Sequence, residues 1–174
     1  MSEQPLPRLV LVDANFLVRA ISKKKPGDDE HKALHLLERV EKARGQIVIP
    51  TPALAEYLVL ADAASLPLLD QLERKACIRL VPFDRAAAYE CANLDAAAKG
   101  RGDKKDGSSS CWQKIKVDRQ IVAIAKASGV GLIVSDDQDV HSNASRVGIR
   151  ATTITALPLP DRLRQGTLRL SKGK

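Results

Sequence analysis

Short aliphatic runs recur along the chain, separated by longer segments with apolar residues every three or four positions. The aliphatic run at 9–12 is too short for a buried helix and fits a strand that is covered on both faces of a parallel sheet. Comparable runs predict strands at 46–49, 78–81, 130–134 and 148–155. The segments between them predict helices at 15–21, 28–44, 53–60, 66–75, 85–99 and 117–127. Because strands alternate with helices, we expect an α/β fold, a three-layer α/β/α sandwich with a mostly parallel central sheet.

Length and composition indicate a single domain. The chain has 174 residues, of which 44% are hydrophobic, and can bury a substantial core. We expect one domain over 1–157 and a basic, flexible tail over 158–174. No stretch approaches the roughly 18 apolar residues that span a bilayer, and the first residues lack a signal-peptide pattern. Three cysteines without a C-x-x-C spacing suit a reducing compartment. We therefore expect no membrane partner and a cytoplasmic location.

The charge of the chain suggests a polyanionic partner. The formal net charge is +7, and neutralisation of phosphates by cations drives nucleic-acid binding. Aromatic residues make up only 3%, so a nucleic acid would be held by its backbone and not by base stacking. The stretch at 100–116 is rich in Gly, Ser, Lys and Arg and is predicted to be a mobile basic loop. Its Trp112 either stacks on a base or, the favoured interpretation, anchors the loop to the core. The candidate nucleic-acid contacts there are Arg101, Lys104, Lys105, Lys114 and Lys116.

Several carboxylates lie where predicted strands end or helices begin. Asp13 follows the first strand, where it either caps the next helix or serves a functional site. Glu56 interrupts an apolar helix, so it is either exposed or held by a cation. Asp118 is expected in the first turn of its helix, and the segment 135–139 carries three more acids after another strand. Strand carboxyl ends and the helix starts that follow them share one edge of a parallel sheet, so these groups are expected to converge. By contrast, Glu90 and Asp95 are expected to be solvated.

Such a cluster needs a cation. Close carboxylate pairs repel by about 4 kcal/mol at an effective dielectric constant of about 20. Oxygen ligands without His or Cys favour Mg²⁺ or Mn²⁺ over zinc. The chemistry expected of such a site is hydrolysis of a phosphodiester by a metal-activated water.

Four short motifs, in this order and on these elements, resemble the PIN domain family. They are Asp13-Ala14-Asn15 after a strand, Pro52 to Glu56 on a helix, Asp118 followed by Ile121 to Ala125, and Val134 to Asp139. The single-domain length is most similar to the VapC-type ribonuclease toxins of toxin-antitoxin pairs. The resemblance implies an Mg²⁺- or Mn²⁺-dependent endoribonuclease that acts on RNA, is neutralised by an antitoxin and forms a homodimer.

The resemblance also assigns roles residue by residue. It implies an acidic catalytic and metal site of Asp13, Glu56, Asp118 and Asp137, with Asp139 as a further metal ligand. Asn15 and Ser135 would be polar support, and a one-residue shift would put Asp136 in place of Asp137. The family usually has Thr at the position of Ser135 and often an aromatic at that of Val140, and the basic loop is longer than usual. These departures leave substrate choice and partner docking open.

Two other functions compete with this one. A nucleic-acid-binding protein that kept the fold without turnover would share the basic charge, although it would have no need of all four acids. A phosphatase or phospho-acceptor switch using Asp13 also needs acids at strand ends. The phosphatase version requires a second Asp where this chain has Asn15. Charge and carboxylates serve RNA and DNA alike, so the sequence does not separate these substrates.

Overall fold

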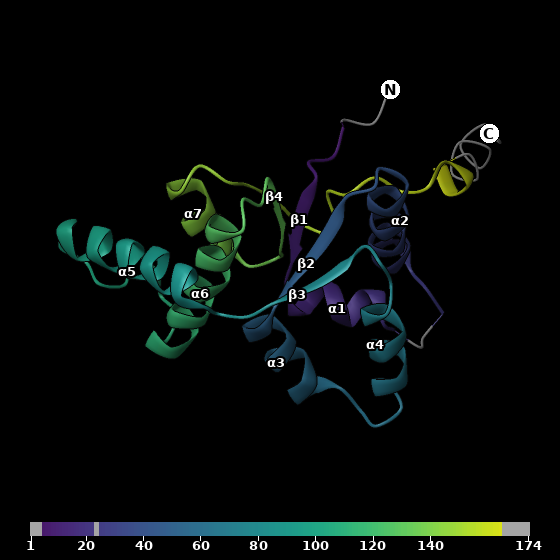
Figure 1. Ribbon diagram of the computed structural model, residues 1–174, viewed down its shortest axis with the longest axis horizontal. Coiled ribbons are helices and arrows are strands. Elements are labelled where there is room, and N and C mark those ends of the chain that lie inside the picture. Colours follow the sequence, from purple (N-terminus) through teal and green to yellow (C-terminus); the bar gives the residue numbers. More distant parts are fainter. Residues whose placement is uncertain (1–4, 23–24, 165–174) are drawn as a thin grey trace, which may run out of the picture.

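A five-stranded sheet lies at the centre of the protein (Figure 1). A computed structural model describes residues 5–22 and 25–164. Within them the strands are β1 (Leu9–Val12), β2 (Gln46–Pro50), β3 (Ile78–Val81), β4 (Leu132–Val134) and β5 (Arg150–Thr152). Their order is β3-β2-β1-β4-β5, and each neighbouring pair is parallel. The expected parallel α/β sandwich is therefore confirmed.

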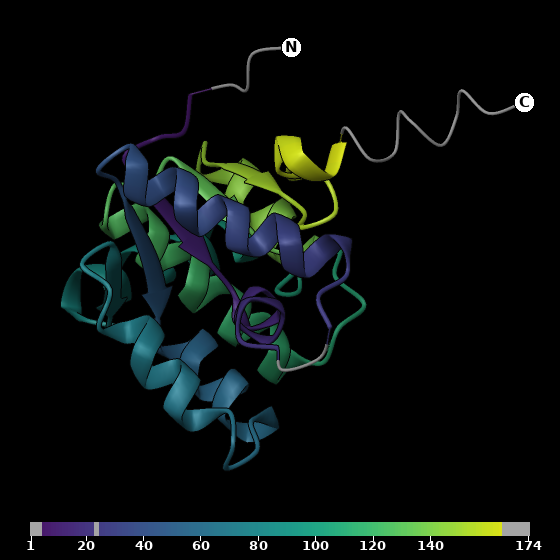
Figure 2. The ribbon, with the colours of Figure 1, turned by 90° about the vertical axis from the view of Figure 1, so that its right-hand side faces the viewer.

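Helices cover both faces of this sheet (Figures 1 and 2). They are α1 (Ala14–Ala20), α2 (Asp28–Lys42), α3 (Thr51–Leu60), α4 (Leu66–Glu73), α5 (Arg85–Gly100), α6 (Trp112–Ala127) and α7 (Gln138–Arg146). Side chains alternate between the faces of a strand, so β1 sends Val10 and Val12 to the core under α1, α2 and α4. Leu11 points to the opposite core, under α5, α6 and α7.

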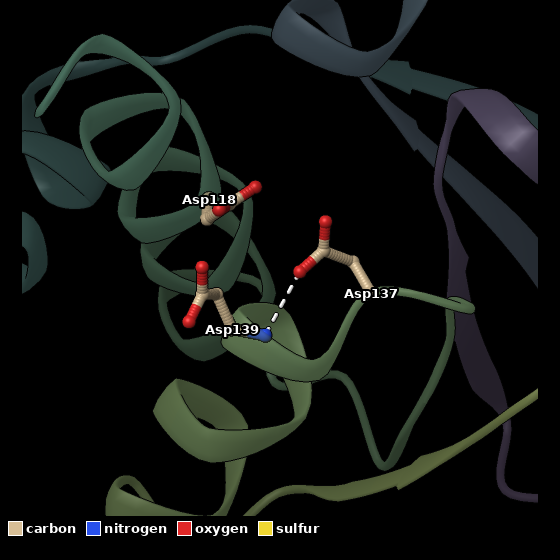
Figure 3. A group of neighbouring side chains, drawn as sticks. All are labelled: Asp118, Asp137 and Asp139. Atoms are coloured by element: carbon tan, nitrogen blue, oxygen red, sulfur yellow. Dashed lines mark hydrogen bonds between the residues drawn. The ribbon is translucent and has the colours of Figure 1, made fainter. Parts of the chain in front are cut away.

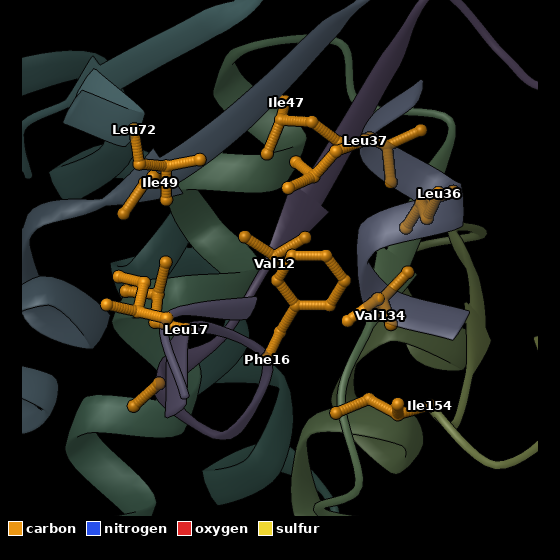
Figure 4. Packing of buried hydrophobic residues seen from close by; sticks show 14 of the residues in the cluster. Val12, Phe16, Leu17, Leu36, Leu37, Ile47, Ile49, Leu72, Val134 and Ile154 are labelled. Carbon is orange, nitrogen blue, oxygen red and sulfur yellow. The ribbon is translucent and has the colours of Figure 1, made fainter. Parts of the chain in front are cut away.

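The first core is closed around Phe16 of α1, which is fully buried (Figure 4). Val12 of β1, Ile47 of β2 and Leu36 of α2 belong to the same cluster. Burial of each such side chain contributes about 1.5–3 kcal/mol relative to exposure. The consequence for the site is a rigid β1, whose last residue precedes Asp13.

Two helices differ from the sequence-based prediction by more than two residues at an end. Helix α6 begins at Trp112, five residues before the predicted start at 117, so Asp118 lies in its second turn. Ile115 continues the buried stripe of α6, but Asp118 and Arg119 are also buried and interrupt the apolar pattern. Helix α7 was not predicted, because among nine residues its buried positions are only Val140, Asn143 and Ala144.

The basic loop between α5 and α6, which was predicted to be mobile, makes polar contacts with the domain. Asp106, with a φ of 57°, accepts hydrogen bonds from Arg101 at 2.9 and 2.6 Å. Arg146 of α7 reaches the same carboxylate, with its Nε 2.9 Å from Oδ2. An ion pair therefore connects the loop to α7.

The expected tail is only partly described. Pro160 is buried and the residues 161–164 form a helical turn, whereas 165–174 lie outside the described residues. In the described part of the chain, no helix combines the length and apolar character needed to cross a membrane.

Candidate metal centre

The carboxyl ends of β1 and β4 are neighbours at the centre of the sheet. Asp13 directly follows β1, and Ser135 directly follows β4. The chain continues from β1 to β2 on one side, while β4 and β5 lie on the other. Ligands of open α/β sheets bind at such a switch in strand order. The topology therefore brings the acids of both segments to this edge.

Asp13 has two structural partners. Its Oδ1 accepts a hydrogen bond from the backbone N–H of Phe16 at 3.0 Å, which caps α1. Its Oδ2 accepts one from the Ser135 hydroxyl at 2.5 Å. Burial raises the pKa of Asp13, and these two hydrogen bonds partly offset the rise. Asp13 therefore caps α1 and also lies at the candidate site, so the two interpretations of this residue do not exclude each other.

The turn after β4 separates Asp136 from Asp137. The Asp136 carboxylate accepts a hydrogen bond from the backbone N–H of Ile154 at 2.9 Å and so faces the segment after β5. The Asp137 backbone N–H donates to the Ser135 hydroxyl at 3.1 Å, and the Asp137 side chain lines a cavity at the sheet edge. The structure therefore places Asp137, and not Asp136, at this cavity.

Three aspartates form an acidic cluster beside the cavity (Figure 3). Asp118, Asp137 and Asp139 each offer a carboxylate oxygen, and these oxygens lie within 4.8 Å of one another. The Asp137 carboxylate accepts a hydrogen bond from the Asp139 backbone N–H at 2.8 Å, which fixes the start of α7. Asp118 comes from α6, Asp137 caps α7 and Asp139 lies in the first turn of α7, as Figure 3 shows.

Two serines of the basic loop hold Asp139. Its Oδ2 accepts hydrogen bonds from the hydroxyls of Ser110 at 2.6 Å and Ser108 at 2.8 Å. Burial raises the pKa of Asp139, but these hydrogen bonds and Lys114 outweigh burial and lower it overall. Neither serine was predicted as a site residue, since nothing in the local sequence indicates that the loop folds onto α7.

Lys114 lies within the acidic cluster. Its ammonium nitrogen is 2.5 Å from Asp137 Oδ2, 2.9 Å from Asp118 Oδ2 and 3.6 Å from Asp139 Oδ2. Burial lowers the pKa of Lys114, but the hydrogen bonds to Asp137 and Asp118 outweigh burial and raise it overall. Lys114 was predicted as a loop cation for nucleic acid. Because α6 starts at Trp112, it instead lies one helical turn before Asp118.

Asp118 is the most buried carboxylate of the cluster, and burial disfavours its ionised form. Its side chain is 6% exposed. Burial raises its pKa to about 6; the Lys114 hydrogen bond opposes this rise, and the charge of Asp137 adds to it. A second positive charge near Asp118, in addition to that of Lys114, would therefore stabilise its ionised form.

Glu56 and Asn15 complete the rim of the cavity, which has a volume of about 410 Å³. Both residues are exposed, so Glu56 is not the buried charge that one interpretation of its helix implied. Surrounding protein, and then the charges of Asp118 and Asp13, raise the pKa of Glu56. Val59 and Leu60 of α3 line the same cavity and are 85% and 70% exposed.

The other loop cations lie outside the acidic cluster. Arg101 is paired with Asp106, and the Lys105 ammonium group donates to the Ser110 carbonyl at 3.0 Å. Lys104 lies 3.9 Å above the Trp112 ring, and Lys116 is exposed.

Trp112 and Asp95 both contact Arg119 of α6. The Arg119 guanidinium carbon is 5.6 Å from the centre of the Trp112 ring, which agrees with Trp112 as an anchor. Asp95 is partly solvated, with 36% of its side chain exposed, and it also accepts a hydrogen bond from the buried Arg119 at 2.5 Å, a partner that was not predicted.

The donor set of this site suits a hard divalent cation. The oxygens of Asp118, Asp137 and Asp139 are close enough to share one ion, and Asp13 and Glu56 line the adjoining cavity. Desolvation, with added repulsion from neighbouring carboxylates, raises the pKa values of Asp13, Glu56 and Asp118, and a nearby cation would favour their ionised forms. Oxygen-only ligands favour Mg²⁺ or Mn²⁺.

Comparisons with solved structures identify proteins of the same fold. VapBC2 of Rickettsia felis, bound to a promoter DNA fragment, matches 83% of this chain and 98% of that chain at 18% identity and a TM-score of 0.56. DNA-bound VapBC of Salmonella typhimurium matches 83% and 97% at 18% identity and a TM-score of 0.55. VapC20 of Mycobacterium tuberculosis, described as a sarcin-ricin loop cleaving toxin, matches 80% and 95% at 15% identity and a TM-score of 0.52.

Comparison with curated protein sequences gives no match. A family model of the PIN domain matches residues 10–146, which include β1 from its second residue, all of β4 and the whole acidic cluster. On this match and the sheet topology, the chain belongs to the PIN domain family.

Proposed function

We propose that this protein is a divalent-metal-dependent endoribonuclease and the toxin of a toxin-antitoxin pair. The observation that carries the proposal is the convergence of Asp118, Asp137 and Asp139 beside a cavity that Asp13 and Glu56 also line. Five carboxylates at one sheet edge repel one another, and a bound divalent cation would relieve this repulsion.

In this proposal Asp118, Asp137 and Asp139 hold Mg²⁺ or Mn²⁺, with Asp13 and Glu56 as further ligands from the cavity. The ion supplies activation of a water molecule and stabilisation of the leaving oxygen. The protein supplies rigid ligands: the Ser135 hydroxyl orients Asp13, and the hydroxyls of Ser108 and Ser110 orient Asp139. Asn15, exposed on the rim, can donate hydrogen bonds to a phosphodiester oxygen.

The basic loop is the proposed contact for the RNA backbone. Three lysines are exposed near the start of α6: Lys104, Lys105 and Lys116. Arg101 forms an ion pair with Asp106, which partly neutralises its charge. A net charge of +7 supports attraction of a polyanion. RNA as the substrate, and the toxin role, are supported by the likeness to VapC20, which is described as cleaving the sarcin-ricin loop.

The proposal includes an antitoxin and a homodimer. The likeness to two VapBC complexes supports a protein partner. Leu58, Val59 and Leu60 expose apolar side chains on α3, and exposed apolar patches mark interaction surfaces. Light scattering of the full chain alone is expected to give twice the monomer mass.

The substitution Asp118→Asn tests the enzymatic proposal. It removes one negative charge from the cluster while keeping the shape of the side chain. With Mn²⁺ and a structured RNA, we expect the rate of cleavage to fall at least about a thousandfold, since a metal ligand is lost. Gel analysis of the RNA measures cleavage, and thermal unfolding verifies the fold.

The matched control is Asp70→Asn, which changes an exposed carboxylate on α4. It is expected to cleave like the wild type, and EDTA is expected to stop both. An active Asp118→Asn protein would contradict the proposal. RNA binding that persists in EDTA, with no cleavage under any condition, would favour a silent binding protein instead.

A further inference from the structure

Lys114 occupies a position that a bound metal ion would also use. Its ammonium group contacts one oxygen from each member of the acidic cluster, Asp118, Asp137 and Asp139. One carboxylate oxygen from each of the same three residues lies within 4.8 Å of the other two, near enough for the three carboxylates to share a single ion. The site therefore already holds one positive charge, supplied by the chain itself.

The two cations compete for the same carboxylates. A lysine ammonium carries three hydrogen donors, and at 2.5 and 2.9 Å it donates to Asp137 and Asp118, two of the carboxylates that would coordinate a metal. Placing a divalent ion beside the ammonium would add a strong repulsion between like charges. Either the ion or the ammonium, and not both, can be held by these oxygens.

The Lys114 side chain is able to leave. It is 40% exposed, and it lines the open cavity together with Glu56 and Asn15. Lysine has a flexible four-carbon stem, so the ammonium can move from the cluster into the cavity without a shift of α6.

We propose that Lys114 is a tethered competitor for the divalent ion: it neutralises the acidic cluster when the metal is absent and must be displaced when the metal binds. This inference rests on the metal site of the proposed function and adds its regulation. The competition weakens the apparent affinity for the metal, so that a higher metal concentration is needed for activity, and the ammonium group stabilises the metal-free fold.

Calorimetric titration of the full chain with Mn²⁺ at pH 7.5 tests the competition. Lys114→Met keeps the length of the stem and removes the charge. If the ammonium occupies the site for about nine-tenths of the time, its removal tightens Mn²⁺ binding about tenfold. Lys114→Arg retains a tethered cation, so its affinity should stay near that of the wild type.

Lys116→Met is the matched control, because it removes the same charge from the same helix at an exposed position. Its affinity for Mn²⁺ is expected to equal that of the wild type, which separates competition within the cluster from a general change in net charge. Thermal unfolding gives a second readout. Without metal, Lys114→Met should melt below the wild type, and saturating Mn²⁺ should raise its melting temperature by a larger increment.

Unchanged or weaker Mn²⁺ binding by Lys114→Met, while the wild type binds the metal, would overturn the inference and leave the proposed function intact. Equal tightening by Lys116→Met would also overturn it. If Lys114→Met does not fold without metal, Lys114→Gln, which keeps a polar end group, is titrated in its place under the same criteria. Absence of Mn²⁺ binding in every protein would overturn both the inference and the metal site on which it rests.

Discussion

At the scale of single residues, Ser135 links the two segments that form the site. Its side chain is completely buried, donates a hydrogen bond to Asp13 and accepts one from the backbone of Asp137. A buried carboxylate that loses a donor keeps its desolvation cost without compensation. One hydroxyl group therefore sets the positions of two candidate metal ligands.

Substitution of Ser135 tests this link. Ser135→Ala is expected to lower the free energy of unfolding by about 1–3 kcal/mol, because it leaves the Asp13 carboxylate and the Asp137 N–H without this partner. Urea unfolding of the metal-free protein measures the change. Ser145→Ala, on the exposed face of α7, should alter stability little. Equal stability of the two variants would mean that the Ser135 hydroxyl does not hold the site.

At the scale of elements, α6 connects the acidic cluster to the rest of the domain. It carries Lys114 and Asp118 on one side, and the fully buried Arg119 on another. Arg119 donates to Asp95 of α5 and, at 2.9 Å, to the Lys104 carbonyl of the basic loop. Arg119 thus fastens α5 and the loop to the helix that presents Asp118.

Removal of Asp95 should weaken this attachment. Asp95→Ala leaves the Arg119 guanidinium buried without its carboxylate, at an expected cost of about 2 kcal/mol in unfolding free energy. The loop amides at 101–111 should also exchange hydrogen faster. Urea unfolding and hydrogen exchange measure both effects. Glu90→Ala on the same helix is the control, and a similar loss of stability in that variant would refute a specific role for Asp95.

At the scale of the whole molecule, the excess of positive charge coexists with acids that resist ionisation. Burial raises the pKa values of Asp13 and Asp118, and partial desolvation together with the charges of Asp118 and Asp13 raises that of the exposed Glu56, so each binds a proton more tightly in the folded state than in the unfolded state. The stability that this protonation contributes is present at low pH and is lost as the pH rises through the folded pKa. Without metal, these three acids therefore make the folded protein less stable near neutral pH than at mildly acidic pH.

We expect the metal-free protein to become more stable as the pH falls from 7.5 to 5. For Asp118 the rise in pKa from 3.8 to about 6 corresponds to at most about 3 kcal/mol, of which about 1.4 kcal/mol is gained between pH 7.5 and 5. Below about pH 4 stability should decline, because acids with lowered pKa values, such as Asp106 and Asp139, are then protonated. Urea unfolding in EDTA at each pH measures the trend.

The variant Asp118→Asn isolates the contribution of Asp118 to this trend. Since Asn does not ionise, the gain between pH 7.5 and 5 should be smaller than in the wild type. A wild-type stability that is flat or falls over this interval would contradict the assigned pKa shifts.

The sequence alone determined the fold class and the chemical character of the site. The β1 run and its Asp13 are local features, because strand periodicity and the placement of acids at strand ends depend only on nearby residues. The same holds for Asp118 on its helix and for the acids after β4. Their convergence followed from one general property of parallel sheets, that strand carboxyl ends share an edge.

Only the tertiary structure decided which groups meet at that edge. It turned Asp136 toward Ile154, brought Ser108 and Ser110 onto Asp139, and buried Arg119 against Asp95. It also placed Lys114, which was predicted in a loop, on α6 and within the acidic cluster. These contacts join residues on different elements, or depend on where a helix begins. Pairwise geometry of this kind arises from packing, which a local pattern of hydrophobic and polar residues does not encode.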